Sequence, residues 1–132
     1  MENVVLDSYA VLVFLFKEKG HEIVLDLLEQ AVEADKKLLI TAPNWAEVRY
    51  ILERKVGAAR WGEVRGKVLG LPIEIIDADQ KLAETSGEIK AFHKMSLADC
   101  FAASLARFKK AEIYTGDPEF KAIEAEQKIV WL

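Results

Sequence analysis

The sequence predicts an α/β protein, a three-layer α/β/α sandwich around a mostly parallel central sheet of about five strands. Short, almost continuously apolar segments alternate along the chain with longer segments in which apolar residues recur at helical spacing. Strands of a parallel sheet that is covered on both faces are apolar throughout, and helices connect them. No repeat, low-complexity tract or linker interrupts this alternation, so we expect one domain over residues 1–132.

Turn and capping residues set the expected boundaries in the first half of the chain. Gly20 is expected to close the first helix, because glycine is favoured just past a helix C-terminus. Pro43 and Asn44 open the third helix, and Gly70 with Pro72 stops the fourth. The elements predicted there are a strand at Asn3–Leu6, helices from Ser8 to about Lys19 and from Glu22 to Asp35, a strand at Leu38–Ile40, and helices from Asn44 toward Lys55 and from Ala58 to Leu69.

The second half continues the alternation of strands and helices. Asp79 is a suitable N-cap for a long helix, and a nearly all-apolar helix follows Ser96. Asp117 followed by Pro118 is typical of the start of a short helix. The elements predicted there are strands at Ile73–Asp77, Glu112–Thr115 and Lys128–Trp131, and helices from Asp79 to about Phe92, from Ser96 to about Ala106 and from Glu119 to about Glu124.

Composition and charge narrow the class of protein. The chain has 52% hydrophobic and 30% charged residues, which is typical of a globular protein. Its one cysteine, Cys100, excludes an internal disulfide, and the apolar run from Tyr9 to Phe16 is too short to span a membrane. This run does not resemble a signal peptide either, because its leader is acidic, Asp7 interrupts it and no small-residue cleavage site follows. We therefore expect a cytoplasmic protein. The net charge of −4 argues against a general nucleic-acid coat but not against an enzyme with an acidic site.

Four acidic residues are expected to meet at one edge of the sheet. Asp7 ends the first strand and Asp117 follows the fourth. Glu47 lies early in the helix after the second strand, and Asp99 lies in the first turn of the helix that leads into the fourth strand. In a parallel sheet all strands end at the same edge, where ligands bind.

Two interpretations of these acids compete. Each of them also fits a helix cap, with Ser96 and Asp99 or Asn44 and Glu47 as capping boxes. Four carboxylates in one pocket would nevertheless repel one another unless a cation lay between them. Their convergence favours a hard, oxygen-preferring ion, Mg²⁺ or Mn²⁺. Zinc is disfavoured, because the spacing of the softer ligands fits no zinc pattern; these are Cys100, His21 and His93.

Other chemistries find less support. The chain has no glycine-rich phosphate loop and no GxSxG nucleophile motif. Three basic residues are placed to hold phosphates near the same edge, although such residues are often only surface charge; they are Lys94, Arg49 and Arg54.

Four segments, in order and at these separations, resemble PIN-domain ribonucleases of the kind found as the VapC toxin of VapBC toxin–antitoxin pairs. The resemblance covers nearly the whole chain. The segments are Val4-Val5-Leu6-Asp7-Ser8, Asn44-Trp45-Ala46-Glu47-Val48, the helix from Ser96 to Ala106 with its LAD sequence, and Tyr114-Thr115-Gly116-Asp117-Pro118-Glu119-Phe120.

The resemblance implies a divalent-metal-dependent endoribonuclease that hydrolyses RNA phosphodiester bonds with Mg²⁺ or Mn²⁺. It implies that Asp7, Glu47, Asp99 and Asp117 are the catalytic and metal-binding residues, with Ser8 and Thr115 as supporting groups. It also implies an antitoxin partner, a homodimer and no membrane association. Two alternatives remain: a catalytically silent PIN-fold binding or scaffold module, and a related metal-dependent DNA phosphoesterase.

Overall fold

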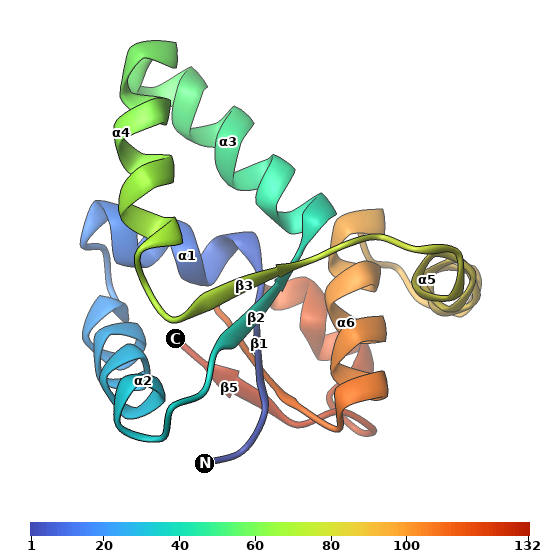
Figure 1. Ribbon diagram of the computed structural model, residues 1–132. Coiled ribbons are helices and arrows are strands. Elements are labelled where there is room, and N and C mark those ends of the chain that lie inside the picture. The colour runs from blue at the N-terminus through green and yellow to red at the C-terminus, as the bar shows by residue number, and fades with distance from the viewer.

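The computed structural model describes residues 1–132 and contains five strands and seven helices (Figure 1). The strands are β1 (Val4–Leu6), β2 (Leu38–Thr41), β3 (Ile73–Ile76), β4 (Glu112–Thr115) and β5 (Ile129–Trp131). The helices are α1 (Ser8–Phe16), α2 (His21–Glu33), α3 (Ala42–Val56), α4 (Ala58–Leu69), α5 (Gln80–Phe92), α6 (Leu97–Lys109) and the 3₁₀ helix η1 (Pro118–Ile123).

All neighbouring strands of the sheet are parallel, and their order is β3-β2-β1-β4-β5. The first three strands lie side by side in chain order, with β2 next to β1 and β3 at the edge of the sheet. The chain then returns through α5 and α6, and β4 pairs with the other side of β1. The strand order therefore reverses between β1 and β4. Ligands of open parallel sheets bind at such a reversal, beyond the carboxyl ends of the strands.

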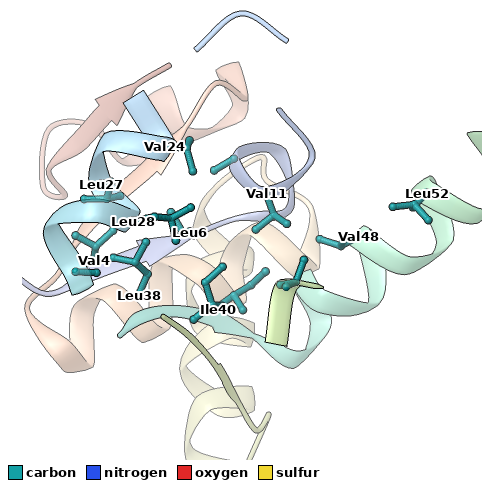
Figure 2. Packing of buried hydrophobic residues seen from close by; sticks show 14 of the residues in the cluster. Val4, Leu6, Val11, Val24, Leu27, Leu28, Leu38, Ile40, Val48 and Leu52 are labelled. Atoms are coloured by element: carbon teal, nitrogen blue, oxygen red, sulfur yellow. The ribbon is translucent and has the colours of Figure 1, made fainter. Parts of the chain in front are cut away.

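Helices cover both faces of the sheet, which confirms the predicted three-layer α/β/α architecture (Figure 1). The alternation of side chains along β1 shows the two faces, because Val4 and Leu6 belong to one hydrophobic cluster and Val5 belongs to the other. In Figure 2, Leu6 and Ile40 from the strands lie among side chains of α1, α2 and α3. The opposite cluster contains most of the buried side chains of α6 together with residues of α5 and η1.

Helix α1 is shorter than predicted, since it ends at Phe16 and not near Lys19. Lys17 takes the left-handed conformation that glycine usually takes after a helix, with φ of 52°, and the Glu18 amide donates to the Val13 carbonyl at 3.0 Å. Gly20 does not close α1 but starts α2. No helix in the molecule combines the length and the apolar character needed to cross a bilayer.

Gly20 is held in a conformation that other residues adopt only with strain. Its φ is +98°, and a Cβ atom there would lie 2.9 Å from the Leu132 Cβ. We predict that Gly20→Ala lowers the free energy of unfolding by about 1–2 kcal/mol. Gly62→Ala is the matched control, because this glycine is exposed in α4 with nothing within 4 Å, and it should raise that free energy by about 0.5–1 kcal/mol. Urea denaturation of both variants measures this, and equal effects would contradict the prediction.

Candidate active site

Asp7 connects the two strands at which the strand order reverses. It follows β1 and is the N-cap of α1, since its Oδ1 accepts a hydrogen bond from the Ala10 amide at 2.9 Å. Its Oδ2 accepts a hydrogen bond from the hydroxyl of Thr115, the last residue of β4. Both side chains are buried, with Asp7 only 1% exposed. The capping interpretation of Asp7 is confirmed, but it accounts for one carboxylate oxygen only.

Glu47 lies in α3 and faces α1. The N-cap of α3 is Thr41, not Asn44, because the Asn44 amide donates to the Thr41 hydroxyl at 3.2 Å. The predicted capping box of Asn44 and Glu47 is therefore wrong. The Oε1 atom of Glu47 instead accepts hydrogen bonds from the Ser8 hydroxyl at 2.9 Å and from the Asn44 side-chain amide at 3.4 Å. These two donors fix Glu47 beside the start of α1.

Asp99 is buried in the first turn of α6 with its carboxylate free of protein hydrogen bonds. Ser96 is the N-cap, and its hydroxyl accepts a hydrogen bond from the Asp99 amide at 3.2 Å. In a complete capping box the Asp99 carboxylate would accept a hydrogen bond from the Ser96 amide. That amide donates to Glu119 Oε1 instead, at 2.7 Å. The Asp99 carboxylate, in a side chain only 4% exposed, is thus available to a ligand.

Asp117 completes the group, and Glu119 joins it. Asp117 is the N-cap of η1 and accepts the Glu119 amide at 2.9 Å, while its own amide donates to the Thr115 hydroxyl at 2.9 Å. One carboxylate oxygen from each of Asp99, Asp117 and Glu119 lies within 4.8 Å of the others. Glu119 was not among the predicted site residues. Its position two residues after Asp117 places it at the same edge of the sheet, but its contact with the Ser96 amide joins segments that no local pattern connects.

Burial and mutual repulsion change the acidity of this cluster. The pKa of Asp7 is raised from 3.8 to about 7, chiefly by burial and to a smaller extent by the charges of Asp117 and Glu47, while the hydrogen bonds from Thr115 and Ala10 act to lower it. Burial raises the pKa of Asp99 from 3.8 to about 8, helped by the charges of Asp117 and Asp7. The charges of Asp117 and Glu47 thus affect Asp7, and those of Asp117 and Asp7 affect Asp99. Only Asp99, Asp117 and Glu119 bring carboxylate oxygens within 4.8 Å of one another, so Asp7 and Glu47 lie outside this closest group.

The donor set suits a hard divalent cation. It consists of carboxylate oxygens, which Mg²⁺ and Mn²⁺ prefer, and the Asp99 carboxylate accepts no hydrogen bond from the protein. Both histidines are engaged elsewhere, because His21 Nδ1 contacts the Glu18 carbonyl at 2.9 Å and His93 Nε2 lies 3.5 Å from Glu126. A cation would offset the repulsion that raises the pKa values of Asp7 and Asp99.

The comparison with known families agrees with the fold. The PIN domain model matches residues 4–126, and the chain belongs to the PIN domain family. No curated protein sequence matches it.

Solved structures of VapC-type proteins share this fold at low sequence identity. DNA-bound VapBC from Salmonella typhimurium superposes with a TM-score of 0.74 at 19% identity, covering 98% of both chains. VapBC2 from Rickettsia felis, bound to a promoter DNA fragment, gives 0.72 at 20% identity, again covering 98% of both chains. Mycobacterium tuberculosis VapC20, described as a Sarcin-Ricin loop cleaving toxin, gives 0.72 at 16% identity, covering 98% of this chain and 100% of its own.

The raised pKa values predict that metal-free protein loses stability as the pH rises. Between pH 4 and 8 the folded state holds protons on Asp7 and Asp99 that the unfolded state has already released. The contribution of these two groups to the free energy of unfolding is therefore fully present below about pH 4. It is lost as the pH rises through their folded-state pKa values of about 7 and about 8. The melting temperature in EDTA should be lower at pH 8 than at pH 5.

The variant Asp99→Asn tests the origin of this dependence. It removes one of the repelling charges and keeps the shape, so it should flatten the decline and raise the melting temperature at pH 8. Asp79→Asn is the control, because Asp79 is an acidic N-cap of α5 outside the cluster, accepting the Leu82 amide at 2.9 Å. A wild-type melting temperature that rises from pH 5 to pH 8 in EDTA contradicts the electrostatic account.

Proposed function

We propose that the protein is a Mg²⁺- or Mn²⁺-dependent endoribonuclease, the toxin of a type II toxin–antitoxin pair. The observation that carries this proposal is the Asp99 carboxylate, in a residue only 4% exposed, which accepts no hydrogen bond from the protein and lies within 4.8 Å of carboxylate oxygens of Asp117 and Glu119 where the strand order reverses. An arrangement of this kind costs stability, and a structural role in capping does not require it. A site that binds a cation for RNA hydrolysis explains why these carboxylates lie so close together.

Each residue of the cluster has a proposed task. Asp7, Glu47, Asp99 and Asp117 are the proposed metal ligands and catalytic residues, and the bound ion would supply a hydroxide from its water and charge neutralisation at the scissile phosphate. Thr115 orients Asp7 by its hydrogen bond, and Ser8 orients Glu47 at 2.9 Å.

Glu119 is a further proposed participant. Its Oε1 accepts the Ser96 amide, which leaves Oε2 free to contact a metal-bound water or the ion itself. Since Glu119 is exposed, we expect its removal to weaken metal binding less than removal of the buried Asp99.

The substrate and partner proposals rest on family resemblance. The structural relatives include VapBC complexes and VapC20, which is described as a Sarcin-Ricin loop cleaving toxin. We therefore propose RNA as the substrate and an antitoxin protein as the partner. A homodimer in the cytoplasm is proposed on the same resemblance. A scaffold role is disfavoured, because a scaffold would not need the repulsion that raises the pKa of Asp99.

Mg²⁺ or Mn²⁺ should raise the melting temperature at pH 7.5, because the ion binds the folded state only. At a metal concentration about 100-fold above the dissociation constant the gain is about 2.7 kcal/mol, roughly a 10 °C shift for a chain of this size. Asp99→Asn should abolish the shift, while the control Asp79→Asn should keep it. Absence of a shift in the wild type at millimolar metal would contradict the metal site.

Cleavage of total cellular RNA with Mn²⁺, followed by sequencing of the new 5′ ends, tests the activity. Wild type and Asp79→Asn should give discrete ends that disappear with chelator, and Asp99→Asn should give none. Single-stranded DNA treated in parallel distinguishes RNA from DNA as the substrate. A metal-dependent melting shift without new RNA ends would contradict the ribonuclease proposal and favour a DNA phosphoesterase or a scaffold, according to the DNA result.

A further inference from the structure

Positive charge is concentrated in one part of the chain. Residues 48–69, which comprise most of α3 and all of α4, carry six basic and two acidic side chains, a net charge of +4. The whole chain has a net charge of −4, so the remainder carries −8. Four of the five arginines of the protein lie in this segment. We call it the α3–α4 hairpin; in Figure 1 its two helices run side by side and project beyond the sheet.

The basic side chains of the hairpin are exposed and mostly uncommitted. Arg49 pairs with Glu53 at 3.1 Å and Arg60 with Glu63 at 3.9 Å. The other four basic residues make no ion pair, although all are exposed; they are Arg54, Lys55, Arg65 and Lys67. Four exposed cations without an ion-pair partner on one projecting element give it a positive field that attracts a polyanion.

The hairpin is continuous with the acidic cluster along one face of α3. Glu47, Ile51 and Lys55 follow one another at intervals of four residues, so their side chains share that face over roughly 12 Å of helix. A cavity of about 350 Å³ lies beside it, lined by Ile51 and Lys55 and by Tyr9 and Phe16 of α1. Ile51 and Lys55, one and two turns beyond Glu47 on α3, therefore form one wall of a cavity whose opposite wall carries aromatic rings of α1. Its remaining charged lining residues, Glu18 and Lys19, are of opposite sign.

Aromatic rings accompany the cations on this surface. The Arg54 guanidinium lies 4.9 Å from the ring centroid of Tyr50, and the Lys55 ammonium lies 4.2 Å from that of Phe16. Tyr9 and Tyr50 are 41% and 42% exposed. The Tyr9 ring has no cation over it and lines the cavity beside Lys55. Cations beside exposed aromatic rings are the combination used to bind single-stranded nucleic acid, with phosphates on the cations and bases on the rings.

We propose that the α3–α4 hairpin binds the phosphate backbone of single-stranded RNA and directs the strand along α3 into the acidic cluster. The inference rests on the proposed ribonuclease function and adds the surface that makes it physically feasible. A phosphate chain is repelled by a body of net charge −8 and by the carboxylates themselves. The hairpin is where a net positive field adjoins the cluster, so productive encounters begin there.

The test compares two triple variants in binding to fluorescein-labelled, single-stranded polyuridylate, in EDTA so that no cleavage occurs. The hairpin variant carries Arg54→Gln, Lys55→Gln and Arg65→Gln. The control carries Lys37→Gln, Lys109→Gln and Lys110→Gln, which removes the same charge from exposed lysines that follow α2 or end α6 and make no side-chain hydrogen bond or ion pair. Circular dichroism of each variant confirms folding.

The hairpin variant should bind polyuridylate about tenfold more weakly at about 50 mM salt, and its slope of log affinity against log salt should be smaller by roughly 2. The control should bind as the wild type does. Equal weakening of both variants, or unchanged binding by the hairpin variant, overturns the inference. So does a wild type that does not bind polyuridylate.

The outcome is separable from that of the proposed function. In one outcome the wild type binds polyuridylate through the hairpin but does not cleave total RNA with Mn²⁺. This outcome would contradict the ribonuclease proposal and support the RNA-binding surface. Metal-dependent cleavage by both the wild type and the hairpin variant, at equal rates over a range of RNA concentrations, would support the ribonuclease and contradict the surface.

Discussion

The hydrogen bond from Thr115 to Asp7 is the interaction on which the site depends. It joins the carboxyl ends of β1 and β4, the two strands between which the order of the sheet reverses. Through the same two residues it fixes the start of α1, because Asp7 caps that helix, and the start of η1, because the Asp117 amide donates to the Thr115 hydroxyl. The acids are thus assembled by backbone topology and capping before any ligand arrives.

Assembly of this kind has a cost that the rest of the fold must offset. Burial of Asp7 and Asp99 raises their pKa values, and each negative charge opposes ionisation of the other. The two hydrophobic clusters on either side of the sheet supply the compensating stability, since both are formed by fully covered aliphatic and aromatic side chains. Repulsion retained in a well-packed domain is typical of residues kept for binding or catalysis.

Much of the fold followed from the sequence because each strand is apolar throughout and each connection is a helix, and only a parallel sheet covered on both faces satisfies that pattern. The site residues Asp7 and Asp117 were predictable because they directly follow strands. The capping residue Thr41 was missed because it also ends a strand, and the end of α1 was missed because Gly20 is a stronger local signal than Lys17. Glu119 was missed for a different reason: its contact with the Ser96 amide joins parts of the chain whose proximity no local pattern encodes.

The central claim is that a divalent cation binds this cluster and displaces the protons that repulsion holds there. Titration calorimetry of Mn²⁺ into the wild type at pH 7, in two buffers of different ionisation enthalpy, measures binding and proton release together. The account predicts saturable binding accompanied by proton release, and loss of both in Asp99→Asn. Binding of equal affinity in Asp99→Asn, or binding that releases no protons, would contradict it.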